Sequence, residues 1–289
     1  LSGKYGLVEL HTRYANNPLP EVRIVDMREQ RRKRLAKGNF SGPLLDQMQG
    51  ALKREEQIIL FQNRRGFAPM VECRECAWIP KCTQCDVSLT YHKRDNRLVC
   101  HYCGYSCEVP HICPACLQPA IEVRGFGTER IEEDVETLFP EVPLARMDMD
   151  TTRSRNAYQE IIDDFASGKS KILVGTQMVT KGLDFDRVSV VGILSADTML
   201  SFPDFRAYER AFQMMSQVAG RSGRGKSRGE VLLQTSQPEL PIIGQVIAHD
   251  YIGMYQEQIL QRQQFGYPPF TRLVYIYLKH RDEAVLDTL

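Results

Sequence analysis

The sequence lacks the marks of a membrane or exported protein. No stretch approaches the roughly 20 consecutive apolar residues that a membrane-spanning helix requires, and the opening residues, Leu1-Ser2-Gly3-Lys4, show no signal peptide. We therefore expect a cytoplasmic protein with no membrane partner. Residues 281–289 resemble the first turns of a helix with nothing after them, which indicates a fragment of a longer chain.

The chain has little excess charge of either sign. Its formal net charge is +1 at pH 7, so no global field points to a polyanion as partner. The basic run Arg31-Arg32-Lys33-Arg34 offers a local patch, although most such runs are solvated surfaces. With 289 residues, 43% hydrophobic and 25% charged, the chain has the composition of a soluble globular protein with one large domain or two ordinary ones.

Cysteine is absent outside one short segment, and that segment is rich in it. All nine cysteines lie between Cys73 and Cys116, and eight of them form C-x-x-C pairs. The pairs are Cys73 with Cys76, Cys82 with Cys85, Cys100 with Cys103, and Cys113 with Cys116. Each pair can turn two sulfurs toward one ion, and zinc accepts four thiolates at tetrahedral angles. The sequence therefore predicts two structural Zn²⁺ sites of four cysteines each, with Cys107 left out.

Three other uses of paired cysteines compete with zinc. Disulfides are disfavoured in a chain without an export signal, because cytosolic reductants keep thiols free. A redox-active C-x-x-C needs one pair at a strand-to-helix junction, whereas these pairs follow one another in turn-rich sequence. Iron is the remaining competitor for a site of four thiolates.

The order of the pairs along the chain suggests how they share metal ions. If the segment is an insertion, its two ends must come back together to rejoin the parent domain, and a metal shared by the outer pairs would hold that neck closed. We therefore expect Cys73, Cys76, Cys113 and Cys116 to bind one ion, and Cys82, Cys85, Cys100 and Cys103 to bind the other.

On both sides of the cysteines, apolar strand-like runs alternate with amphipathic helical stretches. The expected strands are residues 57–62, 121–126, 144–147, 171–175, 188–194 and 230–235. The expected helices are residues 44–55, 154–166 and 203–219, with a further helix that starts near Thr128 and uses it as the N-cap. Continuous apolar strands separated by helices predict an α/β fold, a parallel sheet covered by helices on both faces.

Three loops that follow predicted strands have an unusual composition. Residues 63–66 read Asn-Arg-Arg-Gly, residues 125–130 read Gly-Phe-Gly-Thr-Glu-Arg, and residues 175–182 read Gly-Thr-Gln-Met-Val-Thr-Lys-Gly. Each combines glycine with hydroxyl or basic side chains that can hold a phosphate, although glycine and threonine are also ordinary turn residues. Because function in parallel sheets gathers beyond the carboxyl ends of the strands, we expect these loops to meet on one edge.

Residues 220–227 match the P-loop pattern G-x-x-x-x-G-K-[ST] letter by letter. That loop binds phosphates only between a strand and a following helix. Here a predicted helix precedes it and a predicted strand follows, so we reject the P-loop interpretation. Arg221 and Arg224 instead lie three residues apart at a helical end, where guanidinium groups could reach a γ-phosphate bound by another domain. A basic surface cluster is the plain alternative.

Several segments match named motifs of helicases. Gln217-x-x-Gly220-Arg221-x-Gly223-Arg224 resembles motif VI of superfamily 2 helicases, and residues 175–185 resemble their motif V. Further segments are Asn63-Arg64-Arg65-Gly66, Asp148-x-Asp150-Thr151-Thr152-Arg153, Phe202-Pro203-Asp204-Phe205-Arg206 and Tyr267-Pro268-Pro269-Phe270. With these segments, nearly the whole chain resembles the PriA family of bacterial primosomal replication-restart DNA helicases.

This resemblance implies a RecA-like second helicase lobe with an inserted zinc-binding subdomain. The parent enzyme would use ATP and Mg²⁺ to unwind forked DNA in the 3′ to 5′ direction, and would assemble with primosome proteins. The implied domains are a linker from a missing first lobe (1–45), the lobe itself (46–72 and 117–240), the zinc insertion (73–116) and the start of a truncated C-terminal domain (241–289).

The resemblance also implies roles for single residues, which fall into a nucleotide group and a DNA group. Arg221 and Arg224 would be arginine fingers, Gln217 would sense the γ-phosphate or its attacking water, and Gly182 and Asp184 would lie on the nucleotide side of motif V. Arg64, Thr128 and Thr176 would contact DNA phosphates, the two threonines through helix-start hydroxyls and amides.

The sequence contains no credible Walker A loop and no D-E-x-H box for Mg²⁺. We therefore expect this chain alone to have neither ATPase nor helicase activity. A non-enzymatic zinc module that binds DNA or protein on an α/β scaffold is the alternative function, and a thiol oxidoreductase is a third. Motifs V and VI in the right order favour the helicase, because a pure adaptor has no need for paired phosphate-facing arginines.

Overall fold

The structure is a computed structural model that describes residues 20–63, 70–85, 87–92, 96–100, 102–124, 127–152, 154–180, 185–222 and 229–274. Its strands are β1 (Glu21–Asp26), β2 (Gln57–Phe61), β3 (Met70–Cys73), β4 (Thr90–His92), β5 (Arg97–Val99), β6 (Ser106–Glu108), β7 (Ile121–Arg124), β8 (Leu144–Met147), β9 (Ile172–Gly175), β10 (Val188–Ile193) and β11 (Glu230–Thr235). Its helices are α1 (Met27–Arg32), α2 (Gly42–Lys53), α3 (Thr128–Leu138), α4 (Arg155–Ala166), the 3₁₀ helix η2 (Gln177–Thr180), α5 (Asp197–Leu200), α6 (Ala207–Ala219), α7 (Pro241–Ile247) and α8 (Tyr251–Gln264).

Six strands form one sheet in the order β1-β11-β10-β2-β9-β8. Every neighbouring pair in this sheet is parallel. The central strands β2 and β10 are buried along their whole length, which is why their sequences are continuous apolar runs rather than alternating ones. The predicted parallel α/β sheet is confirmed.

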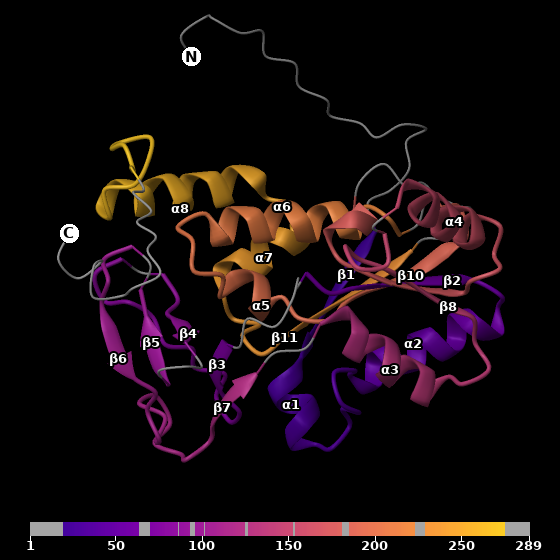
Figure 1. Ribbon diagram of the computed structural model, residues 1–289, viewed down its shortest axis with the longest axis horizontal. Coiled ribbons are helices and arrows are strands. Elements are labelled where there is room, and N and C mark those ends of the chain that lie inside the picture. The colour runs from indigo at the N-terminus through magenta and orange to yellow at the C-terminus, as the bar shows by residue number, and fades with distance from the viewer. Residues whose placement is uncertain are drawn as a thin grey trace, which may run out of the picture.

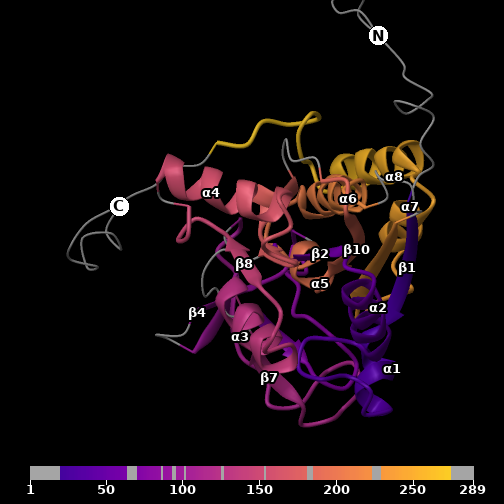
Figure 2. The same ribbon diagram turned by 90° about the vertical axis from the view of Figure 1, so that its right-hand side faces the viewer.

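Helices cover both faces of this sheet (Figures 1 and 2). On one face, Ile58 and Leu60 of β2 pack with Leu44 of α2 and Ile131 of α3. On the other, the alternate residues of the same strands pack against helices α4 to α7, with Phe165 and Met215 fully buried. The alternation follows from the period of two residues along a strand.

The N-terminal part of the described chain differs from the prediction of a linker over residues 1–45. Residues 21–26 form the edge strand β1, and its Val22 lies opposite Val231 of β11. This strand was missed because Glu21 and Arg23 interrupt its apolar residues, as is common on an exposed edge. The lobe therefore includes residues before 46.

The strand predicted at residues 121–126 forms, but it does not join the main sheet. Strand β7 pairs with β3 in an antiparallel ribbon, with Cys73 opposite Ile121. The ribbon is the neck of an inserted module, whose body is the antiparallel sheet β4-β5-β6. Figure 1 shows this module beside the main sheet, below α8.

The packing of the last helices shows no boundary at residue 240. Ile242, Ile243 and Val246 of α7 belong to the same buried cluster as Met215 of α6. Met254 of α8 extends that cluster. Among the helices that the structure describes, none is long and apolar enough to cross a membrane.

Candidate metal centres and phosphate-facing edges

The paired cysteines meet in two groups of four. One group is Cys73, Cys76, Cys113 and Cys116, and the other is Cys82, Cys85, Cys100 and Cys103. Within each group, the sulfur atoms all lie within 4.8 Å of one another. A tetrahedral ion with bonds of about 2.3 Å would hold its sulfurs about 3.8 Å apart, so the donor sets fit zinc. The structure therefore groups the cysteines in the predicted nested arrangement.

The same backbone turn presents the sulfurs of the Cys73–Cys76 pair and of the Cys113–Cys116 pair. At Cys73 the carbonyl oxygen accepts a hydrogen bond from Ala77 N at 2.9 Å, and at Cys113 it accepts one from Leu117 N at 2.9 Å. The residue after the second cysteine takes a left-handed conformation, with φ of 60° at Ala77 and 60° at Leu117. Such a φ is uncommon for residues other than glycine. The turn thus imposes a backbone geometry that the C-x-x-C spacing alone does not reveal.

The thiols in each group resist ionising together when no cation is present. Burial raises the pKa of Cys76 to about 12. At Cys113 burial acts in the same direction, but hydrogen bonds from the Cys116 and Ala115 backbone outweigh it and lower the pKa to about 7. Four thiolates within a few ångströms repel one another, so the group needs a thiophilic cation to become fully deprotonated.

The two cysteine groups have different places in the module. The outer group lies at its neck, where Cys73 ends strand β3 and Trp78 packs against the buried cluster of Cys73, Cys113 and Ala120. The inner group lies in the body of the module beside the buried Leu98. Cys107 lies on β6 and belongs to neither group.

One predicted DNA contact, Thr176, lies at the carboxyl end of β9. Its side chain is buried, and its backbone N–H donates to Met147 O, at the end of β8, at 3.3 Å. Strand β2 lies next to β9 and ends at Phe61, so Asn63 follows it on the same edge. Arg64 lies outside the described residues.

The prediction that Thr128 caps its helix is wrong. The N-cap of α3 is Gly127, which has no side chain to bond, and Thr128 is the first helical residue. The Thr128 hydroxyl instead donates to Asp148 Oδ2, beyond the end of β8, at 2.5 Å. Because that hydroxyl is engaged, the start of α3 offers a phosphate the backbone N–H groups of its first turn but not this hydroxyl.

Asp148 collects several hydrogen bonds at this edge. Besides Thr128, its carboxylate accepts bonds from the backbone N–H of Asp150 at 2.9 Å and of Thr151 at 3.0 Å. Burial raises the pKa of Asp148, but the bonds from Thr128 and Thr151 and the charge of Arg146 lower it by more, so the carboxyl stays below its ordinary value. The turn after β8 and the start of α3 are therefore held to one anchoring carboxylate.

Two predicted nucleotide residues lie on the opposite edge of the sheet. Helix α6 runs from the carboxyl end of β10 back to the amino end of β11, and Gln217 is exposed on its last turn. Arg221 follows the helix and is half-buried. The next residue, Ser222, is buried and donates from Oγ to Ser189 O at 3.1 Å. This bond fixes the end of α6 beside the start of β10.

The connection from β9 to β10 spans both edges. It leaves the carboxyl edge at Thr176 and reaches the amino edge at Val188, where β10 begins. The ring of Phe185 packs edge-on against Phe165, with centroids 4.7 Å apart. Gly182 and Asp184 within this connection, and Arg224 after α6, lie outside the described residues.

The chain order of helix α6, residues 220–227 and strand β11 agrees with the rejection of the P-loop.

The residues that attach the module to the lobe were not predicted from the sequence. Tyr267 Oη donates to Cys85 O at 2.8 Å, and Phe205 N donates to Tyr102 Oη at 3.3 Å. The rings of Phe205 and Tyr267 stack, with centroids 4.7 Å apart and 12° between their planes. Both of these residues lie in segments that carried the family resemblance, which was the available signal for them.

Two protein families match parts of the chain. Residues 82–107 match the PriA DNA helicase Cys-rich region (CRR) domain, and residues 126–226 match the helicase conserved C-terminal domain. The second match covers strands β8, β9 and β10 and helix α6, so the parallel sheet is that of a RecA-like helicase lobe.

Proteins named "Replication restart protein PriA" are similar to this chain over most of its length. The Bacillus subtilis protein is 42% identical over 285 residues, which are 98% of this chain and 35% of that protein. The Synechocystis protein is 41% identical over 274 residues, 92% of this chain and 32% of that protein. The Haemophilus influenzae protein is 39% identical over 285 residues, 98% of this chain and 38% of that protein. The chain thus spans about a third of the length of these relatives.

Proposed function

We propose that this chain, which belongs to the PriA family of replication restart proteins, supplies the second motor lobe and the metal-binding module of an ATP-dependent DNA helicase. The observation that carries the proposal is the insertion itself. A module with two groups of four cysteines leaves a RecA-like lobe after the buried strand β2 and returns to it before α3. In this proposal, the insertion contains residues 73–116, and helices α7 and α8 pack as part of the lobe.

The amino edge of the sheet is the side that meets the nucleotide. Arg221 and Arg224 act on a γ-phosphate that the first lobe of the parent protein holds together with Mg²⁺. Guanidinium groups there stabilise the charge that develops during phosphoryl transfer. Gln217 positions the attacking water, and Gly182 and Asp184 contact the nucleotide from the β9–β10 connection. The buried bond of Ser222 supports this role, because it restrains the segment that carries Arg221.

The carboxyl edge is the side that meets DNA. Thr176, the first-turn amides of α3 at Thr128, and Arg64 contact phosphates along one strand. Such contacts carry no sequence information, which suits a motor that moves along any sequence in the 3′ to 5′ direction. The two edges are joined by the β9–β10 connection and by α6, so a change at the nucleotide can move the DNA contacts.

Two Zn²⁺ ions hold the module together, one in each cysteine group. Sites of four thiolates are closed and leave no coordination position for water, so the metal contributes folding free energy rather than chemistry. The outer ion closes the neck beside β3 and β7, and the inner ion fixes the surface that faces the lobe. In the parent protein, the module supports contacts with forked DNA and with primosome proteins in the bacterial cytoplasm.

Binding of forked DNA tests the proposal. The chain should bind a fluorescein-labelled fork with an affinity that falls steeply as salt rises, because phosphate contacts release counterions. Forks of unrelated sequence should bind equally well, and Thr176→Ala should weaken all of them alike. Absence of binding at low salt, or binding to one sequence only, would contradict the DNA-binding role.

A further inference from the structure

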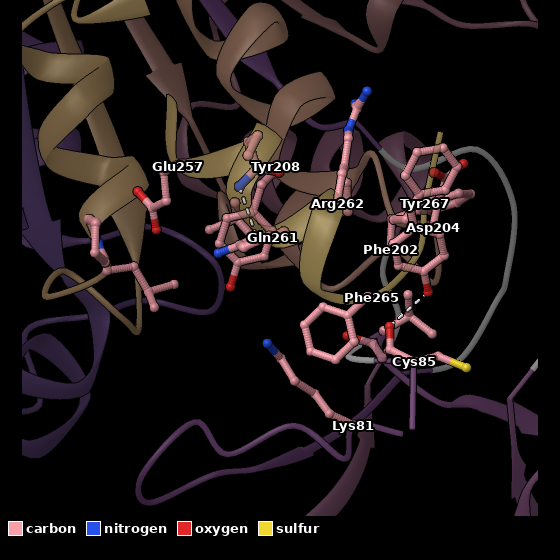
Figure 3. A pocket seen from close by; sticks show the side chains of 18 residues that line it. Lys81, Cys85, Phe202, Asp204, Tyr208, Glu257, Gln261, Arg262, Phe265 and Tyr267 are labelled. Atoms are coloured by element: carbon pink, nitrogen blue, oxygen red, sulfur yellow. Dashed lines mark hydrogen bonds between the residues drawn. The ribbon is translucent and has the colours of Figure 1, made fainter. Parts of the chain in front are cut away.

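A cavity of about 180 Å³ lies between the Cys-rich module and the motor lobe. Lys81, Cys85 and Ser88 line it from the module, while α6, α8 and the segment before α6 line it from the lobe. Figure 3 shows Lys81 reaching from the module toward the space below Tyr208 and Gln261. Its size suits one planar group, since sites for drug-sized ligands measure about 300–1,000 Å³.

The walls of this cavity are fixed to each other. Tyr267, one of the lining residues, is buried, donates to Cys85 O at 2.8 Å and stacks on Phe205. The Tyr267 ring also contacts the Tyr102 ring edge-on, with centroids 5.8 Å apart. Tyr102 lies in the sequence between Cys100 and Cys103 of the inner group. The cavity is therefore a built feature of the junction, and its shape depends on the inner cysteine group.

Aromatic rings dominate the apolar part of the lining. They belong to Phe202, Phe205, Tyr208, Phe265 and Tyr267. Phe202 is 55% exposed and Phe265 is 39% exposed, so ring surface remains accessible to a ligand. Exposed aromatic rings beside a cation are the means by which proteins hold unstacked bases of single-stranded nucleic acid.

The charges of the lining favour a neutral group inside and one anionic group at the mouth. Asp204 forms an ion pair with Arg210 at 2.7 Å, and Arg262 forms one with Glu209, so these two lining charges are compensated within the lobe. Glu257 adds a negative charge to the wall, which disfavours an acidic peptide as the occupant. Lys81 is exposed and lies 5.7 Å from the centroid of the Tyr208 ring, where its ammonium can meet a phosphate.

The cavity also lies on the edge of the sheet that carries the proposed DNA contacts. Phe202 and Phe205 follow β10, the module follows β2, and Thr176 follows β9, which is the neighbour of β2. All of these strands are parallel, so the segments after them leave from the same edge. Thr176 and the module therefore lie on the same side of the sheet.

We propose that this cavity takes one unstacked base of single-stranded DNA. Phe202 and Phe265 hold the base by stacking, and Lys81 binds the adjoining phosphate. Gln261 and Ser88, also in the lining, offer hydrogen bonds to base edges without selecting one base. The inference rests on the proposed DNA-binding function and adds to it a base-binding site outside the helicase motifs.

Fluorescence anisotropy with two probes of equal charge tests the site. One probe is an oligothymidylate, and the other is the same sugar-phosphate chain with abasic positions. Phe202→Ala should weaken binding of oligothymidylate by about 5- to 100-fold and leave the abasic probe unaffected, whereas Lys81→Ala should weaken both. Tyr255→Ala is the matched control, because Tyr255 is an aromatic residue on α8 that is 52% exposed and does not line the cavity.

Three results would overturn the site. Phe202→Ala binds both probes like the unaltered chain, or loses affinity for both equally, or Tyr255→Ala has the same effect as Phe202→Ala. Because Phe202 is exposed, its variant should keep its melting temperature and metal content, so a folding defect is visible separately. In those cases the unaltered chain still binds DNA, and the proposed function stands. Failure of the unaltered chain to bind either probe would reject both proposals.

Discussion

Asp148 is the residue at which three parts of the carboxyl edge of the sheet meet. It follows β8, holds the turn at Asp150 and Thr151, and accepts the hydroxyl of Thr128 at the start of α3. Arg146 lies 3.6 Å from its carboxylate. These donors stabilise the charged form, so folding and ionisation of Asp148 favour each other.

Replacing Asp148 with asparagine should destabilise the fold in a pH-dependent way. At pH 7, the loss of charge-assisted hydrogen bonds should lower the free energy of unfolding by about 1–3 kcal/mol. Because the folded-state pKa of Asp148 lies below its ordinary value, its stabilising effect is present above the unfolded pKa of about 3.9. The effect is then lost as pH falls through the folded pKa, so the difference should shrink below about pH 3.9.

Urea unfolding at steps between pH 7 and pH 3 checks this prediction. Asp46→Asn on the exposed side of α2 is the control, and it should cost little at any pH. A difference between Asp148→Asn and the unaltered chain that stays constant over the whole range would contradict the role given to the Asp148 charge.

At the scale of single residues, the cysteines were predictable and Thr128 was not. The C-x-x-C spacing was enough to predict the metal ligands, because both ligands of a pair come from one turn. The partner of Thr128 is 20 residues away along the chain. A capping threonine and a threonine bonded across the edge look the same in sequence.

At the scale of elements, the buried strands were predictable because continuous apolar runs mark them. Strand β1 was not, since its charged residues point away from the core at the edge of the sheet. The place of β7 was also missed. The sequence indicates that residues 121–124 are extended, but it does not show their partner. Strand β7 pairs with β3 because the chain returns from the module beside the strand by which it entered.

Replacing a cysteine at either end of the module should remove the same metal ion. Cys76→Ser and Cys113→Ser each remove a ligand from the outer group, so each chain should fall from two bound zinc ions to about one. The single tryptophan, Trp78, packs against this group, so its emission should shift in both variants. Cys85→Ser should remove the other ion and leave the emission of Trp78 largely unchanged.

Metal content by plasma mass spectrometry, with tryptophan emission as a second readout, measures this. Cys107→Ser is the control, because Cys107 belongs to neither group. Retention of different ions in Cys76→Ser and Cys113→Ser would reject the nested arrangement.

The attachment of the module to the lobe should depend on the Tyr267 hydroxyl. Tyr267→Phe keeps the ring that stacks on Phe205 but removes the bond to Cys85 O. The carbonyl then loses a partner, so the free energy of unfolding should fall by about 0.5–1.5 kcal/mol. Thermal unfolding should show this loss for Tyr267→Phe and no loss for Tyr255→Phe on the exposed side of α8. Equal melting temperatures for all three chains would contradict it.

At the scale of the whole molecule, the proposed nucleotide contacts and the proposed DNA contacts lie on opposite edges of one sheet. Thr176 lies at the carboxyl edge and Arg221 at the amino edge, with β9–β10 and α6 between them. This separation could be expected once strands and motifs were placed, because every strand of the main sheet runs the same way. The docking of the module could not, because its contacts join Tyr102 to Phe205 and Cys85 to Tyr267, which are 103 and 182 residues apart.

This chain alone should not hydrolyse ATP. In the proposed function, its arginines act on a nucleotide that another lobe holds, and its sequence has no Walker A loop in the required context. Phosphate release by the purified chain, with and without forked DNA, checks this expectation. Turnover that DNA stimulates and that Arg224→Ala abolishes would show that the chain holds a complete active site.

The most direct test of the central claim is ATP turnover by a full-length protein that contains this sequence. Arg221→Ala should lower the DNA-stimulated kcat by about 10³-fold or more, as loss of an arginine finger does. Arg32→Ala, an exposed arginine on α1, should leave kcat unchanged, and both variants should keep two zinc ions. Undiminished turnover by a correctly folded Arg221→Ala protein would contradict the assignment of this chain as the arginine-bearing lobe of a helicase motor.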